Sequence, residues 1–487
     1  MVNYSQFLNM LPEATLVLAL IIVFFADFAL LRSPRKTFTL GVLTGALLVC
    51  QLVPCFIAQP TDAFGGIYVT SPMVNVMKTI LTAGTLIVVI MSQTWLRGGS
   101  QIVNGQSSTS KYAGEFYMLL LSTLLGMYMM MSSGSFLMFF LGLEMASVPL
   151  ACLVAFDKHK KNSAEGAAKY ILVATFSSGV MLFGISFLYA ATGSLYFDNV
   201  AETITVKPLT IIGLVFFFSG LGFKISLVPF HLWTADTYQG APTPVTGYLS
   251  VVSKGAAALT LAIILMKVFA PMVDYWEPML YIVVVLSITI ANLFAIRQKE
   301  LKRFMAFSSI SQAGYIMLAV IGNSQLGVAA LTFYVLVYVV ANMAVFTVIS
   351  AVEHNGGSTM MSAYNGLYQS NPKLSLLMTI ALFSLAGIPP FAGMFSKFFV
   401  FLAAVGGHES APFWPYFVVF VALVNTVVSL YYYLLIVKAM YITKEYNPLP
   451  AFRTDGATRL ALTICTAGIL LFGVVSCFYN WIANAAL

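Results

Sequence analysis

The sequence predicts an all-α polytopic membrane protein with about fourteen transmembrane helices, each long enough to cross a bilayer. The chain has 487 residues, of which 60% are hydrophobic and only 8% are charged. A water-facing domain carries about 25% charged residues, so this composition excludes an ordinary soluble protein. The apolar runs are long and do not alternate with polar residues, which indicates helices rather than the strands of an outer-membrane barrel.

Each predicted span is a run of roughly 20 apolar residues. In chain order the spans are 11–31, 37–58, 72–95, 112–131, 134–156, 164–191, 208–238, 242–270, 272–297, 301–322, 325–352, 373–406, 412–441 and 456–485. Two spans, 208–238 and 373–406, are too long for one straight crossing and carry prolines, Pro229 in the first and Pro389-Pro390 in the second. Proline removes a backbone donor and clashes with the preceding turn, so both helices are expected to break there.

The lysines and arginines of the loops set the orientation of the chain. When the loops are assigned alternately to the two sides, one side receives only Lys207 and Lys267. By the positive-inside rule both termini then lie on that side, which we expect to be the periplasm of a bacterial inner membrane. The absence of a transit peptide favours a bacterial or an organelle-encoded protein. The cytoplasmic side receives Arg32, Arg35, Lys36, Arg97, Lys111, Lys158, Lys160, Lys161, Arg297, Lys299, Lys302, Arg303, Lys373, Lys444, Arg453 and Arg459.

The order of the spans indicates an internal repeat. We expect N-terminal helices in 1–111, a first five-helix repeat in 112–270, a second in 271–441 and a C-terminal helix in 442–487. In each five-helix block the fourth span is interrupted by proline and carries a central lysine. Because five is odd, the second block must run inverted relative to the first. Inverted repeats with interrupted helices are typical of transporters.

A few charged residues lie deep inside predicted spans: Glu144, Lys224, Lys254 and Lys397. Each such charge costs about 2.5–3.5 kcal/mol to insert at the bilayer centre, so a chain that needed only to fold would carry leucine there. Structural ion pairs between helices are the alternative, but a single glutamate cannot pair with all of these lysines. Lysines held without a matching acid exchange protons more readily, which favours a proton relay.

Other polar residues in the spans are ambiguous. His231 is the only histidine inside a span and is a candidate relay group, although it also suits hydrogen bonding at the break. Lys78, Lys169 and Lys438 lie near predicted helix ends, where snorkelling to the interface is an equal alternative. Polar side chains on the tenth and thirteenth spans suit water chains, but helix–helix contacts are the favoured interpretation: Ser308, Ser309, Ser311, Gln312, Tyr431, Tyr432 and Tyr433.

Nothing in the sequence indicates a redox or metal site in this chain. The cysteines (Cys50, Cys55, Cys152, Cys465 and Cys477) are scattered and lack the spacing of a zinc or iron–sulfur site. No Gly-rich nucleotide-binding loop lies between a strand and a helix. We therefore expect no cofactor and no metal here.

Particular segments resemble one family. Residues 223–245 read FKISLVPFHLWTADTYQGAPTPV, residues 302–311 read KRFMAFSSIS, and residues 387–397 read GIPPFAGMFSK. Together with Glu144 in the fifth span, they resemble the antiporter-like subunits of NADH:quinone oxidoreductase (respiratory complex I), which are similar to subunits of Mrp-type antiporters. The resemblance is good over roughly 112–441. M-type subunits carry glutamate where this sequence has Lys397. L-type subunits continue beyond the fourteenth span, where this sequence ends. The resemblance is therefore greatest to the N type.

The resemblance implies roles and partners. Glu144 and Lys224 would form a charge-coupled pair, Lys254 a central bridge, and Lys397 the relay to the opposite face. Other membrane subunits would be the partners, and NADH, FMN, iron–sulfur clusters and quinone would belong to partner subunits. A stand-alone or Mrp-type cation/proton antiporter subunit, a small-solute carrier and a structural membrane anchor are the alternatives.

Overall fold

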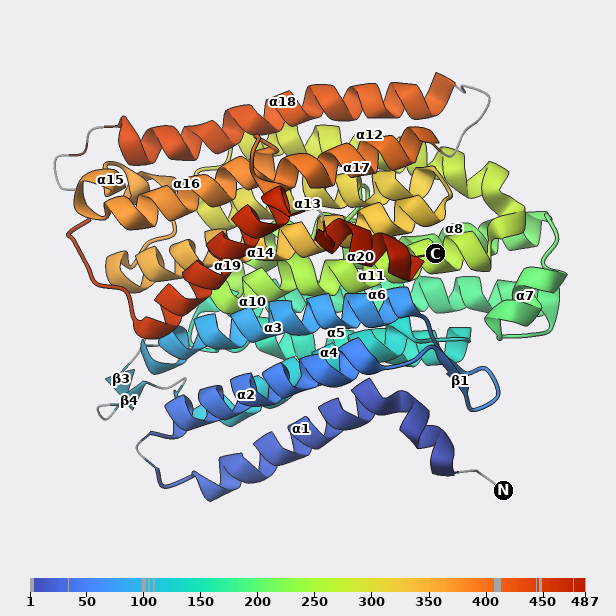
Figure 1. Cartoon of the computed structure of the whole chain (residues 1–487), viewed down its shortest axis with the longest axis horizontal. Coiled ribbons are helices and arrows are strands. Elements are labelled where there is room, and N and C mark those ends of the chain that lie inside the picture. The colour runs from blue at the N-terminus through green and yellow to red at the C-terminus, as the bar shows by residue number, and fades with distance from the viewer. Residues whose placement is uncertain are drawn as a thin grey trace.

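The computed structural model is a bundle of helices that run side by side along the long axis of the molecule (Figure 1). It describes residues 4–33, 35–98, 102–103, 106–107, 110–406, 413–443, 445, 449–475 and 477–486, so Lys444 of the loop cations lies outside the described residues. Within these ranges, 13 helices are long and apolar enough to cross a membrane, and two shorter apolar helices make up the predicted span 373–406. The predicted all-helical membrane fold is confirmed.

The N-terminal part contains three long helices and a β-hairpin that lies at the same end of the bundle as the N-terminus (Figure 1). A second short hairpin lies at the opposite end. The elements of this part are η1 (Tyr4–Met10), α1 (Leu11–Ala29), α2 (Lys36–Ile57), β1 (Thr61–Ala63), β2 (Tyr68–Thr70), α3 (Pro72–Gly98), β3 (Ile102–Val103), β4 (Gln106–Ser107) and η2 (Ser110–Tyr112). Both hairpins are antiparallel, and Thr61 pairs with Thr70 in the first.

The middle of the chain forms the next group of helices. Its elements are α4 (Ala113–Met131), α5 (Phe136–Val154), α6 (Lys161–Thr192), α7 (Phe197–Thr203), α8 (Pro208–Ile225), α9 (Thr234–Gly240), α10 (Thr243–Tyr248), a π-helical turn η3 (Leu249–Ser253) and α11 (Lys254–Lys267). The last part of the chain contains η4 (Ala270–Met272), α12 (Val273–Ile296), α13 (Leu301–Ile321), α14 (Gln325–Gly356), η5 (Met361–Tyr364), α15 (Leu367–Ser370), α16 (Pro372–Ala386), α17 (Ala392–Gly406), α18 (Phe413–Tyr441), α19 (Gly456–Val474) and α20 (Cys477–Ala486).

Both predicted helix breaks are present, a few residues before the prolines. α8 ends at Ile225, and Ser226 takes a left-handed φ of 67°. α16 ends at Ala386, and Gly387 takes a φ of 89°. A left-handed residue directs the following N–H groups back to the last carbonyls, and proline then prevents the helix from continuing. At the first break, the amides of Ser226 and Leu227 accordingly donate to the carbonyls of Phe223 and Gly222.

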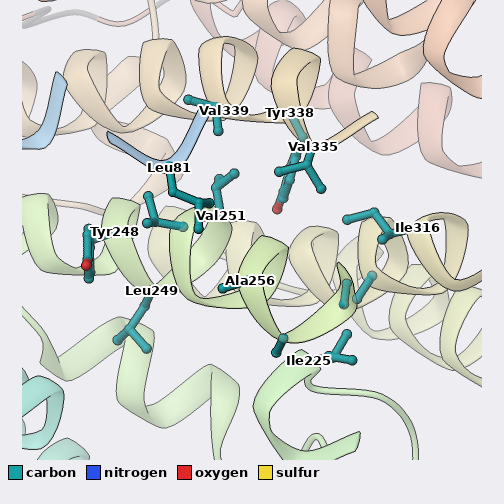
Figure 2. Packing of buried hydrophobic residues seen from close by; sticks show 14 of the residues in the cluster. Leu81, Ile225, Tyr248, Leu249, Val251, Ala256, Ile316, Val335, Tyr338 and Val339 are labelled. Carbon is teal, nitrogen blue, oxygen red and sulfur yellow. The ribbon is translucent and has the colours of Figure 1, made fainter. Parts of the chain in front are cut away.

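The core lies around α13, α14 and the segment from α10 to α11. The most apolar window of α13 is 100% buried, whereas that of α1 is only 28% buried. Figure 2 shows this packing: Leu81 of α3 and Val251 of η3 lie beside Val335 and Val339 of α14. The outer helices expose large apolar side chains, as expected for surfaces that face lipid or neighbouring subunits.

The structure differs from the predicted spans at two places. The π-helical turn η3 interrupts the span 242–270 directly before Lys254. The span 456–485 is divided into α19 and α20 at Val475. The turn η3 contains no proline or glycine, and Val475 is neither, so no local signal predicted either interruption. A π turn needs only one inserted residue.

A glycine at the second break provides a test of the packing. A Cβ on Gly393 would lie 1.6 Å from the carbonyl oxygen of Ser384. Gly393→Ala is therefore expected to destabilise the protein by about 1–3 kcal/mol, because backbone has to move. Gly179→Ala in α6 is the matched control, since no atom lies within 4 Å of its Cβ position. The thermal unfolding midpoints of Gly393→Ala and Gly179→Ala are compared in detergent. Equal midpoints would contradict the close packing of Gly393 against Ser384.

Candidate functional site

Lys224 is held at the end of α8 by a neutral partner. The side chain is 6% exposed, and its Nζ donates to the hydroxyl of Tyr170 on α6 at 3.0 Å. Because α8 ends one residue later, at Ile225, Lys224 lies where regular helix gives way to an irregular turn.

Glu144 approaches Lys224 from α5 without forming a direct ion pair. Its carboxylate interacts electrostatically with Lys224 and with Tyr170. Glu144 is only partly buried, and nearby α5 side chains such as Leu141 and Val148 are exposed. The predicted coupling of Glu144 with Lys224 is therefore compatible with the geometry, but the pair is looser than a salt bridge.

His231 lies in the turn between α8 and α9. It is half-buried, and it contacts the backbone of Pro229. Among the described residues it makes no hydrogen bond to Lys224, since the break at Ile225 removes the common helix face that a continuous helix would have provided.

Lys254 is the most deeply buried of the predicted relay lysines. It is 1% exposed and begins α11, directly after η3. Its Nζ donates to the hydroxyl of Ser309 on α13 at 2.7 Å and lies 5.6 Å from the ring of Tyr238. Ser309, interpreted from the sequence as a helix-contact residue, is thus the direct partner of this lysine.

Lys397 lies on α17, just after the second break. Its Nζ donates to the carbonyl oxygen of Ala386, the last residue of α16, at 3.0 Å. The Nζ also lies 4.9 Å from the ring of Tyr315 on α13. An interrupted helix leaves its last carbonyls without amide partners, so the break itself supplies the acceptor for this lysine.

Polar side chains occupy the space between Lys254 and Lys397. A cavity of about 10 Å³, roughly the space that one water needs, is lined by Lys397 together with residues such as Gln312 and Tyr338. Gln312 accepts a hydrogen bond from Tyr334 and donates to the hydroxyl of Tyr433 at 3.2 Å. Tyr433 in turn bonds to Ser308 at 2.5 Å. Tyr431, by contrast, is 55% exposed and lies outside this network.

The three predicted relay lysines share one property. Among the described residues, none of the ion pairs involves Lys224, Lys254 or Lys397. Each Nζ is met by a neutral oxygen instead. The alternative of structural salt bridges between helices therefore has no support at these positions.

The other predicted lysines have different environments. Snorkelling is wrong for Lys78, which is fully buried and paired with Glu13 at 2.7 Å. Its position near the start of α3 suggested the interface, but α1 and the first hairpin cover it. Lys438 is exposed, as snorkelling requires.

Lys169 belongs to an ion-pair network that the sequence did not reveal. Its Nζ pairs with Glu165 at 2.7 Å and with Asp236 at 2.6 Å, and Asp236 also binds Arg303. The network joins α6, α9 and α13. Burial raises the pKa of Asp236, but the hydrogen bonds from Lys169 and Arg303 outweigh it and hold the pKa below its usual range. The Glu165–Lys169 pair follows the i,i+4 spacing of a helix, but no spacing rule links Lys169, Asp236 and Arg303, since 67 residues separate each of these from the next.

The comparisons with known proteins decide the family. A family model described as NADH:quinone oxidoreductase/Mrp antiporter, TM, matches residues 133–429. The chain is 54% identical over 486 residues to NADH-quinone oxidoreductase subunit N of Phocaeicola vulgatus, with 100% of both chains covered. The chain belongs to the NADH:quinone oxidoreductase/Mrp antiporter family.

Solved structures agree with this family. A chain of respiratory complex I from Thermus thermophilus is 30% identical, with a TM-score of 0.76 and coverage of 95% of this chain and 97% of that one. A chain of the Mrp complex from Dietzia sp. has a TM-score of 0.84 and 19% identity, over 98% of this chain and 97% of that one. The second similarity concerns the fold alone. No group of three or more potential metal ligands occurs among the described residues.

The Asp236 network leads to a prediction on stability. Asp236→Asn is expected to destabilise the protein by about 0.5–1 kcal/mol at neutral pH, because the carboxylate is partly exposed and its ion pairs are screened. A lowered pKa contributes stability above the unfolded pKa of about 4, and this stability is lost as pH falls through the folded value. The difference in thermal unfolding midpoint between the unsubstituted protein and Asp236→Asn should be smaller in acid than at pH 7. Asp198→Asn, which breaks the more exposed pair with Lys267, is the control; an unchanged difference in acid would contradict the assignment.

Proposed function

We propose that this chain is the N-type proton-translocating membrane subunit of an NADH:quinone oxidoreductase, and that Glu144, Lys224, Lys254 and Lys397 carry the protons, with His231 as an accessory relay group. The observation that carries this proposal is the set of buried lysines held by neutral oxygens in one bundle. Full-length similarity to a subunit with this name supports the choice of complex.

The geometry suits a stepwise transfer. The negative charge of Glu144 favours the ammonium form of Lys224, so a change in the position or charge of Glu144 promotes release of the proton from Lys224. Lys254 receives the proton near the bundle centre, next to Ser309. The network around Gln312 and its cavity leads on to Lys397. Transfer of one charge against 100 mV requires about 2.3 kcal/mol, which the complex supplies.

The arrangement of helices supports the proposed repeats, 112–270 and 271–441. Each block contains one interrupted helix, α8–α9 in the first and α16–α17 in the second. Lys224 precedes its break, whereas Lys397 follows its own. The proposed repeat is therefore one of helix arrangement and not of residue positions.

Partners and location follow from the same proposal. Neighbouring antiporter-like and small membrane subunits would cover part of the apolar surface, for example the exposed face of α5 next to Glu144. NADH, FMN, iron–sulfur clusters and quinone would be bound by partner subunits. We place the chain in a bacterial inner membrane with both termini in the periplasm, because the loop cations gather on the other side.

A stand-alone or Mrp-type antiporter subunit is the alternative, and assembly separates the two functions. A subunit of the oxidoreductase should co-migrate on a native gel with a large assembly that oxidises NADH. Co-migration with a cation-transporting assembly that lacks this activity would favour the antiporter.

Substitution of Lys224 tests the relay. Lys224→Ala is expected to lower proton translocation in sealed vesicles by at least about tenfold, because a positioned proton-transfer group typically contributes more than that. Assembly is checked on a native gel, and Lys207→Ala, an exposed lysine before α8, is the control. An assembled Lys224→Ala complex that pumps normally would show that Lys224 is a structural charge.

Substitution of Ser309, the partner of Lys254, is expected to lower proton translocation less than substitution of Lys224 does. Ser309→Ala removes one hydrogen bond to a charged group, worth about 1.5–3 kcal/mol, without removing the titratable group itself. Quinone-linked pumping should be slowed but measurable. Ser186→Ala on the exposed face of α6 is the matched control; equal rates for the two variants would remove Ser309 from the path.

A further inference from the structure

A second buried ionisable site lies outside the path described above. Lys78 of α3 is fully buried, and its Nζ lies 2.7 Å from Oε1 of Glu13 on α1. The hydroxyl of Tyr68 donates to Oε2 of Glu13 at 2.9 Å, and Lys78 donates to the Tyr68 oxygen at 3.3 Å. Ser132, which follows α4, donates to Glu13 at 3.4 Å. The pair is thus shielded from lipid and held by neighbours from several elements.

Lys78 belongs to a polar stripe along α3. Asn75, Lys78, Thr82 and Thr85 recur at helical spacing and are all buried, so they share one inward face. Thr82 bonds to the hydroxyl of Tyr128 on α4, which also contacts the sulfur of Cys55 at 3.2 Å. The Nζ of Lys78 lies 5.5 Å from the Tyr128 ring.

The inner end of the stripe reaches the region before Lys254. Tyr248, the last residue of α10, bonds to Thr123 of α4 at 2.8 Å and interacts with Thr85. α3 packs against the π turn in the same region: a Cβ on Gly84 would lie 3.1 Å from Val252, and Figure 2 shows Leu81 beside Val251. The stripe therefore runs from the middle of the bundle toward the end at which α3 begins.

The outer end of the stripe lies under the first hairpin. Tyr68 belongs to β2, and the hairpin lies at the end of the bundle where the N-terminus also lies (Figure 1). Asp62 at the hairpin is exposed, and its carboxylate accepts from the amide of Gly66 at 3.1 Å. In the proposed orientation this end faces the periplasm, opposite the basic loops.

A purely structural clasp between α1 and α3 is the competing explanation. A buried ion pair is weak support for that role, because well-packed apolar residues of similar volume often stabilise a protein equally well. A clasp also has no use for a line of hydroxyl groups that extends from the pair toward the segment before Lys254. The stripe therefore favours proton transfer over a purely structural ion pair.

We propose that Glu13 and Lys78 form a proton-release site on the periplasmic side, fed along the α3 stripe; this inference rests on the proposed function. Lys78 gives one proton to the Glu13 carboxylate, which leaves a neutral amine beside a carboxylic acid. Glu13 releases that proton toward the hairpin as Lys78 takes up the next proton arriving along the stripe, so neither residue is left charged without its partner. One proton enters and one leaves, so the pair returns to its starting state.

Lys78→Arg in the intact complex tests this role. Arginine preserves the ion pair with Glu13 but does not release a proton under these conditions. The release site predicts an assembled complex with a clear loss of proton translocation per NADH oxidised, whereas a clasp predicts normal pumping. Lys36→Arg, which preserves the pair with Asp27 at 2.7 Å near the other end of α1, is the matched control.

A second variant covers the case in which arginine does not fit. Glu13→Leu combined with Lys78→Met removes both charges together and leaves no buried charge unpaired. Loss of pumping in every variant that assembles supports the release site, and normal pumping in any assembled variant overturns it. Failure of both to assemble, with Lys36→Arg assembling, assigns the pair a structural role and also overturns it. Lys224→Ala is measured in the same vesicles: if it pumps normally too, the proposed function itself fails rather than this inference alone.

Discussion

The structure depends on how a buried ammonium group is satisfied without a matching acid. Lys224, Lys254 and Lys397 each donate to a neutral oxygen, of a tyrosine, a serine and a backbone carbonyl respectively. A carboxylate partner would be left as an uncompensated buried charge whenever the lysine lost its proton. A neutral oxygen carries no such penalty, so these lysines are able to change protonation state without disrupting the bundle.

The irregular backbone follows from the same requirement. Inside a membrane every backbone polar group needs a partner, so interrupted helices occur where protein surrounds them. The break at Ala386 exposes a carbonyl that Lys397 uses, and the π turn η3 ends directly before Lys254. The break after Ile225 lies one residue beyond Lys224. Each relay lysine thus lies beside an irregularity that supplies polar groups or changes the direction of a side chain.

Much of the fold was predictable because its signals are local. Apolar runs defined the spans, and Pro229 and Pro389-Pro390 marked the interrupted helices. The depth of Lys224, Lys254 and Lys397 within those runs identified the candidate site. The π turn was not predictable, since it carries no distinctive residue. The sequence left the environment of Lys78 open and did not predict the Asp236–Arg303 contact, because Glu13 lies 65 residues from Lys78 and Arg303 lies 67 residues from Asp236.

The most direct test of the account is Lys254→Arg in the intact complex, with proton translocation and quinone-linked electron transfer measured together in sealed vesicles. Arginine keeps the positive charge and the donor to Ser309 but retains its proton. If the buried lysines work by changing protonation state, an assembled Lys254→Arg complex loses translocation. If it pumps at the normal rate, the charge at this position is sufficient, and the protons do not pass through Lys254.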